Sequence, residues 1–151
     1  MLDRRQKAPD FQLPSTSGNL FHLSKDAKGK ALVLYFYPKD NTKVCTQQAC
    51  NLRDNFEILK ELDILIIGIS TDSVKKHLEF KERNNLPFEL LSDRDGKVSK
   101  LYKAHIPFLN LSKRVTYLLN TDHEIVMRLN DLFSAESHIK ETIENLNLLK
   151  S

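Results

Sequence analysis

Residues 31–37, Ala-Leu-Val-Leu-Tyr-Phe-Tyr, form a short, unbroken apolar run that is rich in residues favouring β-structure. A run of this length is typical of a strand that is buried on both faces. The polar segment 38–42 then turns the chain, and apolar residues return at helical spacing from Cys45 onward. A buried strand, a loop and a helix in this order favour folds in which helices pack on a central sheet.

The rest of the chain continues this alternation of strands and helices. An N-terminal hairpin is predicted because the breaker-rich segment 14–18 separates two short strand-like runs. In chain order, the predicted elements are the hairpin 11–13 and 20–23, the strand 31–37, a helix with one face formed by Cys45, Ala49, Leu52, Phe56, Leu59 and Leu62, the strand 64–69, a helix from the cap Ser73 to about Arg83, the strand 88–91, a short helix within 96–104, the hairpin 115–119 and 124–129, and a final helix carrying Ile139, Ile143, Leu146 and Leu149 after Ser134. This order predicts an α/β fold with a mixed sheet and helices on both faces.

Composition indicates an ordinary globular protein of one domain, residues 1–151. The chain has 40% hydrophobic and 28% charged residues, which is enough apolar material to bury a core without staples. No stretch reaches the roughly 18 apolar residues of a membrane span, and the N-terminus lacks the apolar segment of a signal peptide. We therefore expect a cytoplasmic protein that does not contact a membrane.

Charge and histidine spacing argue against two further classes of function. The net charge is only +3, and basic residues occur in pairs such as Lys75-Lys76 and Lys113-Arg114 rather than in longer blocks. Nucleic-acid binding needs a clustered basic face, so no nucleic-acid partner is expected. The five histidines are scattered and form no recognised ligand spacing with the two cysteines, so we expect neither a metal nor a cofactor.

Cys45 is the strongest candidate for a reactive residue. Its predicted position in the first turn of a helix places it near backbone N–H groups that have no partner inside the helix. These groups carry partial positive charge and favour a thiolate, the nucleophilic form of cysteine, over the neutral thiol. The alternative is that Cys45 is an inert interior residue, which is common for free cysteines.

Pro38, Thr42 and Cys45 form the spacing Pro-x-x-x-Thr-x-x-Cys, and Cys50 follows five residues later. In a reducing compartment, two such cysteines are more often redox-active or free than part of a permanent bridge. A thioredoxin-like disulfide exchanger would instead carry Cys-x-x-Cys. A further alternative is a non-catalytic interaction module in which both cysteines are inert.

The sequence resembles the peroxiredoxins, and in particular the bacterioferritin comigratory protein or peroxiredoxin Q branch. The residues that carry the resemblance extend over the chain: Ala8-Pro-Asp-Phe11, Tyr35-Phe-Tyr-Pro-Lys-Asp-Asn-Thr42, Cys45-Thr-Gln-Gln-Ala-Cys50-Asn-Leu-Arg-Asp54, and the strand that begins near Arg114. This resemblance implies a thioredoxin-like fold with an added N-terminal hairpin. It also implies a thiol-dependent peroxidase of the atypical 2-Cys type that reduces hydrogen peroxide and organic hydroperoxides.

The same resemblance implies a role for each site residue. Cys45 would be the peroxidatic thiolate, Cys50 the resolving thiol that forms an intramolecular disulfide, and Thr42 the hydroxyl that positions the peroxide. Arg114 would be the cation beside the sulfur, and Pro38 a shield against water. Thioredoxin or a similar dithiol would re-reduce the disulfide, and a monomer could complete this cycle because both cysteines lie in one chain.

From the residues alone, these side chains also have structural interpretations. Arg114 could be a surface cation at a strand edge, Thr42 a helix cap, and Pro38 a strand terminator. Gln48, three residues after Cys45, resembles the Glu or Gln that the family has at this position, so the resemblance adds it as a weaker, supporting site residue. One departure is visible, because many members of the branch have Pro-Gly before the catalytic cysteine and this chain has Lys43-Val44. A β-branched Val disfavours positive φ, so we expect this part of the loop to keep φ negative.

Overall fold

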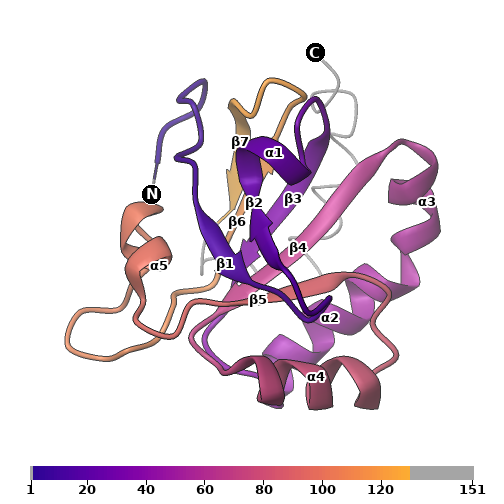
Figure 1. Cartoon of the computed structure of the whole chain (residues 1–151), viewed down its shortest axis with the longest axis vertical. Helices are drawn as coiled ribbons and strands as arrows, with labels where there is room; N and C mark the ends of the chain where they lie inside the picture. Colours follow the sequence, from indigo (N-terminus) through magenta and orange to yellow (C-terminus); the bar gives the residue numbers. More distant parts are fainter. Residues whose placement is uncertain (1, 130–151) are drawn as a thin grey trace.

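A five-stranded mixed sheet lies at the centre of the computed structural model, which describes residues 2–129 (Figure 1). The strand order is β5-β4-β3-β6-β7, in which β3, β4 and β5 run parallel and β6 and β7 pair antiparallel. The strands are β3 (Ala31–Phe36), β4 (Ile64–Ser70), β5 (Glu89–Ser92), β6 (Val115–Leu119) and β7 (Ile125–Leu129). The predicted mixed sheet is confirmed, and each predicted strand lies within two residues of its observed bounds.

The central position of β3 in the sheet explains why its sequence is apolar throughout. Every residue of β3 is buried, since the strand lies between β4 and β6 and both faces of the sheet are covered. The β3–β6 register places Phe36 opposite Val115. The carboxyl end of β3 therefore lies beside the amino end of β6, which is the geometry that forms the candidate site described below.

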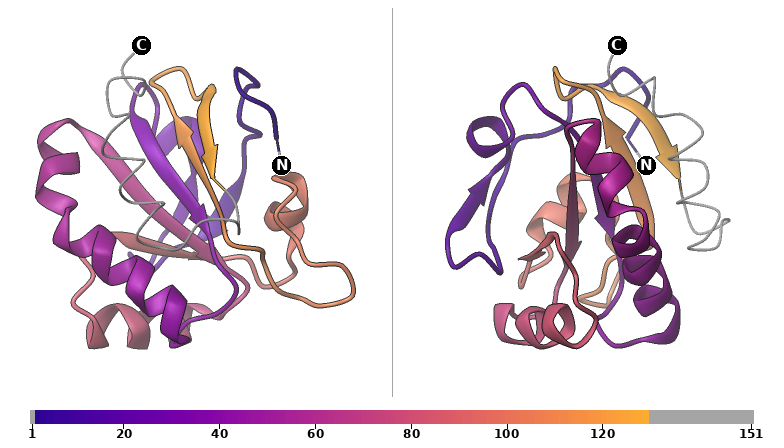
Figure 2. Two further views of the ribbon diagram at one scale, coloured as in Figure 1. Left: turned by 180° about the vertical axis from the view of Figure 1, so that it is seen from behind. Right: turned by 90° about the vertical axis from the view of Figure 1, so that its right-hand side faces the viewer.

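Two clusters of buried side chains cover the two faces of the sheet. Figure 2 shows the helices and the hairpin that lie on these faces. On one face, alternate residues of β3 such as Val33 and Tyr35 pack against α2 (Lys43–Asp54), α3 (Phe56–Glu61) and α4 (Val74–Arg83). On the other face, Leu32 and Leu34 pack beneath the hairpin β1 (Gln12–Pro14) and β2 (Leu20–His22), with α1 (Leu23–Asp26) and α5 (Lys97–Leu101). Helices on both faces and the N-terminal hairpin are thus confirmed.

The predicted helical face from Cys45 to Leu62 is divided between two helices. α2 ends at Asp54 and α3 begins at Phe56, with Asn55 between them at φ −108° and ψ 9°. The Asn55 side-chain amide donates to the Asn51 carbonyl at 2.8 Å, which is the kind of local bond by which asparagine competes with the helical ladder. The apolar spacing continues across this break, so periodicity alone does not reveal it.

The remaining elements follow the predicted order. Ser73 accepts a hydrogen bond from the Lys76 amide and caps α4, which ends at Arg83 as predicted. The predicted helix within 96–104 is shorter, because α5 covers only Lys97–Leu101. The predicted C-terminal helix after Ser134 lies outside the described residues. Within residues 2–129, none of the helices is long and apolar enough to cross a membrane.

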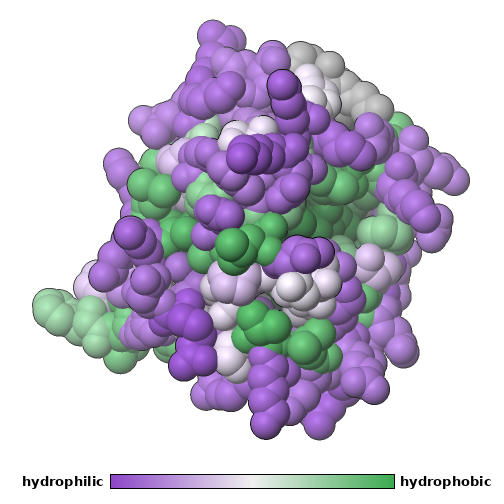
Figure 3. All heavy atoms as spheres, viewed as in Figure 1, coloured by the Kyte–Doolittle hydropathy of each residue, from purple (hydrophilic) through white to green (hydrophobic). Residues whose placement is uncertain are grey.

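The loop between α5 and β6 projects from the body of the protein and exposes apolar side chains. Phe108 is fully exposed and Leu109 is 54% exposed. Figure 3 shows the corresponding hydrophobic projection at the side of the molecule on which α5 lies in Figure 1. These side chains are accessible for contacts with another molecule.

Candidate active site

Cys45 is the third residue of α2, so the prediction that it lies in the first turn of a helix is confirmed. Its thiol is free, and the residue is only 2% exposed. Thr42 and Val44, which flank it at the helix start, are exposed. The sulfur therefore lies just beneath the surface at the end of the helix where backbone N–H groups are unpaired.

Arg114 lies beside this sulfur. Its Nη2 donates to Cys45 Sγ at 3.1 Å. The contact joins residues that are 69 positions apart, and it arises because Arg114 directly precedes β6 while the loop before α2 directly follows β3. The guanidinium is half-buried, so the interpretation of Arg114 as a surface cation at a strand edge is wrong. The contact places a fixed positive charge directly against the sulfur.

Gln48 holds the guanidinium in place. It lies one helical turn after Cys45 on α2, and its Oε1 accepts a hydrogen bond from Arg114 Nη1 at 2.7 Å. Its Nε2 donates to Thr116 Oγ1 on β6 at 3.5 Å. The two nitrogens of the Arg114 fork are thus divided between Gln48 and Cys45, which fixes the plane of the guanidinium.

Thr42 occupies the N-cap position of α2, but its side chain makes no capping hydrogen bond. The Oγ1 instead donates to the Lys39 carbonyl at 2.9 Å, so the predicted capping role of the hydroxyl is wrong. Pro38 is half-buried at the start of the same loop. Neither Lys43 nor Val44 has a positive φ, as expected, and both belong to α2. The loop's left-handed residue is Asn41 at φ 64°.

Cys50 lies on the same helix as Cys45 and is partly exposed. Its Sγ is 3.8 Å from Asn84 Oδ1, at the end of α4, and Arg53 Nη1 donates to the Asn84 carbonyl at 2.7 Å. Residues five apart in an α-helix have Cα atoms about 8 to 9 Å apart. Because a disulfide spans no more than about 7 Å between Cα atoms, the two cysteines cannot bond while this helix is intact.

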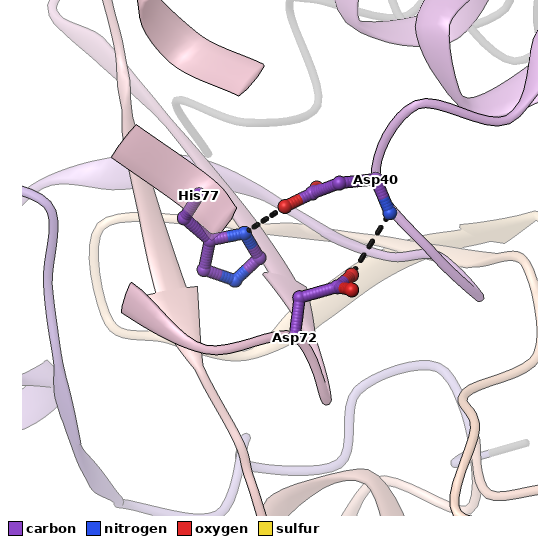
Figure 4. A group of neighbouring side chains, drawn as sticks. All are labelled: Asp40, Asp72 and His77. Carbon is purple, nitrogen blue, oxygen red and sulfur yellow. Dashed lines mark hydrogen bonds and ion pairs between the residues drawn. The ribbon is translucent and has the colours of Figure 1, made fainter. Parts of the chain in front are cut away.

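A second polar cluster, formed by Asp40, Asp72 and His77, lies behind the loop and was missed by the sequence analysis (Figure 4). The three side chains bring their oxygen and nitrogen atoms within 4.8 Å of one another. One feature of the sequence could have indicated this cluster, because Asp40 and Asp72 follow the parallel strands β3 and β4 at their carboxyl ends. Residues in such positions meet at one edge of a sheet.

Comparison with known proteins places this geometry in a family. Residues 5–128 match the AhpC/TSA family, and the chain belongs to it. Members of this family are peroxiredoxins, which are thiol-dependent peroxidases. The protein is accordingly a peroxidase of the peroxiredoxin class.

Its relatives define the branch more narrowly. Peroxiredoxin Bcp of Bacillus subtilis is 40% identical over 147 residues, covering 93% of this chain and 92% of the relative. The chloroplastic peroxiredoxin Q of Sedum lineare is 41% identical over 143 residues, covering 94% of this chain and 76% of the relative. The predicted Bcp or peroxiredoxin Q branch is confirmed.

Solved structures confirm the thioredoxin-like fold. The crystal structure of peroxidoxin BcpB from Mycobacterium tuberculosis superposes with a TM-score of 0.92 at 30% identity and covers all of both chains. A cysteine-to-serine mutant of Xylella fastidiosa PrxQ superposes with a TM-score of 0.88 at 24% identity, covering 97% of this chain and 96% of that one. Both share the overall architecture of this chain.

Proposed function

We propose that this protein is a thioredoxin-dependent peroxiredoxin of the atypical 2-Cys type, in which Cys45 attacks hydrogen peroxide or an organic hydroperoxide and Cys50 resolves the product. The contact of 3.1 Å between Arg114 Nη2 and Cys45 Sγ carries the proposal. It supports an ionised sulfur at a helix N-terminus, held beside a cation that is itself fixed by Gln48.

In the first step, the Cys45 thiolate attacks the terminal oxygen of the hydroperoxide. The O–O bond breaks, an alkoxide or hydroxide leaves and takes up a proton, and the sulfur becomes a sulfenic acid. Negative charge moves from the sulfur toward the leaving oxygen. Arg114 and the first amides of α2 are placed to stabilise this charge, because donors fixed before the reaction need no rearrangement during it.

Thr42 and Pro38 have supporting roles in this proposal. The Thr42 hydroxyl lies at the exposed helix start and can turn from the Lys39 carbonyl to the bound peroxide. Pro38 brings no N–H group to the loop, and it limits the access of water to the sulfur. Gln48 acts by orienting Arg114.

In the second step, the Cys50 thiol attacks the sulfenic acid, water leaves, and a disulfide forms between the two cysteines. An external dithiol, thioredoxin or a related protein, then reduces this disulfide and is itself oxidised. The net reaction converts a hydroperoxide and a dithiol into an alcohol, water and a disulfide. The cycle needs one chain, so we propose a monomer, formed by a single domain of residues 1–151 and working in the cytoplasm.

Titration of the fully reduced protein with hydrogen peroxide tests this function. One equivalent of peroxide should consume both thiols, and mass spectrometry should locate one intramolecular disulfide between Cys45 and Cys50. Addition of thioredoxin and its reductase should then restore both thiols and sustain peroxide consumption. If the thiols survive excess peroxide, or if only disulfides between chains form, the proposed reaction is wrong.

Disulfide formation should also change the structure of α2. Because the intact helix keeps the cysteines too far apart, its first turns must unwind, and Cys50 must leave Asn84. We expect lower helix content in the oxidised protein, measured by far-ultraviolet circular dichroism before and after one equivalent of peroxide. Identical spectra, with the intramolecular disulfide verified in the same sample, would contradict this expectation.

A further inference from the structure

The loop that carries Thr42 is held by hydrogen bonds on its buried side. Lys39, Asn41 and Thr42 are exposed, whereas the side chain of Asp40 is only 1% exposed. Asp40 Oδ2 lies 2.6 Å from His77 Nδ1 on α4, and Figure 4 shows the two side chains pointing toward one another. His77 itself is fully buried.

Counting protons shows that this pair shares one. The other ring nitrogen, His77 Nε2, lies 2.9 Å from the Leu91 carbonyl, which can only accept, so Nε2 carries a hydrogen. The contact with Asp40 then needs a second proton, which is either on the ring as an imidazolium facing a carboxylate or on the carboxyl group facing a neutral ring. Both arrangements make one strong hydrogen bond in a site without solvent.

Further bonds hold the same loop residue. Asp40 Oδ1 accepts a hydrogen bond from Tyr37 Oη at 2.6 Å, and the Asp40 backbone N–H donates to Asp72 Oδ2 at 2.8 Å. Asp72 in turn accepts from Ser70 Oγ at 2.6 Å. Burial, with added effects of Tyr35 and Asp40, raises the pKa of Tyr37 well above its ordinary value, so its hydroxyl keeps the proton that it donates.

These contacts also argue against a cation at this cluster. Both oxygens of Asp40 and both nitrogens of His77 already have hydrogen-bond partners. A metal ion would have to displace them. The cluster therefore joins the loop to the ends of β4, β5 and the first turns of α4, rather than forming a ligand site.

We propose that Asp40 and His77 are positioning residues for the peroxidase reaction, because their buried hydrogen bond fixes the loop that places Thr42 against the peroxide at Cys45. This inference rests on the proposed function. Thr42 is two residues from Asp40, and its hydroxyl is held by the Lys39 carbonyl of the same loop. Loss of the anchor would let Thr42 shift while Cys45 stays beside Arg114, since that contact joins α2 to the residue that directly precedes β6.

The test compares two reactions of the same sulfur in a Cys50→Ser background. Hydrogen peroxide uses the geometry of the loop, whereas iodoacetamide alkylation reports the nucleophilicity of the Cys45 thiolate alone. Asp40→Ala should slow oxidation by peroxide about 100-fold, the cost of displacing a positioning group by about 1 Å. The same variant should change the alkylation rate by less than about threefold, because Arg114 and the helix amides still stabilise the thiolate.

Asp40→Asn tests whether the hydrogen bonds are what matter. An asparagine can accept from Tyr37 through its oxygen and donate to a neutral His77 through its nitrogen. It should therefore restore the peroxide rate to within about fivefold of the parent, since the loop keeps its anchor. Asp63→Asn is the matched control, because this carboxylate is 72% exposed and its ion pair within residues 2–129 is with Lys30 at 3.3 Å, away from the loop.

His77→Ala and the double variant test whether the pair acts as a unit. If it does, Asp40→Ala and the double variant should have equal peroxide rates, because the second substitution removes nothing further. Thermal unfolding shows which variants are folded at the assay temperature, and Asp40→Asn supplies the test if an alanine variant is not. Any one of four results would overturn the inference. These are equal losses in both reactions, no loss at all in Asp40→Ala, failure of Asp40→Asn to recover, and losses that multiply in the double variant. If the Cys50→Ser parent itself fails to react with peroxide, the proposed function is wrong instead.

Discussion

Replacing Cys45 with serine should reduce peroxide consumption to the uncatalysed background, a loss of at least about 1,000-fold, because no other group in the proposed mechanism can accept the oxygen. Serine at this position keeps the size of the side chain, and Arg114 can still donate to its oxygen. The substitution therefore removes the nucleophile while leaving the surroundings nearly intact. Peroxide consumption measured with thioredoxin and its reductase gives the comparison.

Cys50→Ser is the matched control for this experiment. It leaves the Cys45 sulfur in place, so the first oxidation should proceed at nearly the wild-type rate and then stop after one turnover with thioredoxin as reductant. A Cys45→Ser variant with wild-type turnover, or a Cys50→Ser variant that turns over repeatedly with thioredoxin, would exclude the proposed division of labour between the two cysteines.

Replacing Arg114 with methionine should produce the second-largest effect. Removal of a single preorganised donor from a reacting centre typically costs about 100- to 1,000-fold in rate, and we expect the second-order rate constant with hydrogen peroxide to fall by this amount. Arg114 Nη2 contacts the sulfur directly, and methionine fills a similar volume without a charge. Gln48 would also lose the partner of its Oε1.

Two further variants separate charge from geometry. Arg114→Lys keeps the charge but cannot serve both Gln48 and Cys45 through a planar fork, so its rate should lie between those of the wild type and the methionine variant. Lys113→Met removes the neighbouring exposed cation and should leave the rate unchanged. Equal rates for Arg114→Met and Lys113→Met would mean that the guanidinium has no part in the reaction.

Much of this site could be predicted because its chemistry is local in sequence. The apolar run of β3, the polar loop and the helical spacing from Cys45 placed the cysteine in the first turn of a helix, where it is found. The order of strands and helices likewise predicted the mixed sheet. Arg114 was a candidate only through the resemblance, because spacing does not show that a residue 69 positions away reaches the sulfur.

Other features depend on contacts that no periodic pattern records. The Asp40 and His77 pair joins two elements 37 residues apart, and a buried histidine on α4 has the same helical spacing as an apolar one. The break at Asn55 depends on a side-chain bond to Asn51, while the apolar face continues through it. The hydroxyl of Thr42 bonds back into its loop rather than capping α2, a choice set by the loop's conformation.

The most direct measurement of the central claim is the site of the first oxidation. Reduced Cys50→Ser protein, mixed with one equivalent of hydrogen peroxide and trapped with dimedone, should carry one adduct per chain, and fragmentation in the mass spectrometer should place it on Cys45. Arg114→Met in the same background should give far less adduct at short times. An unlabelled Cys45, recovered as a free thiol while peroxide is consumed, would contradict the account.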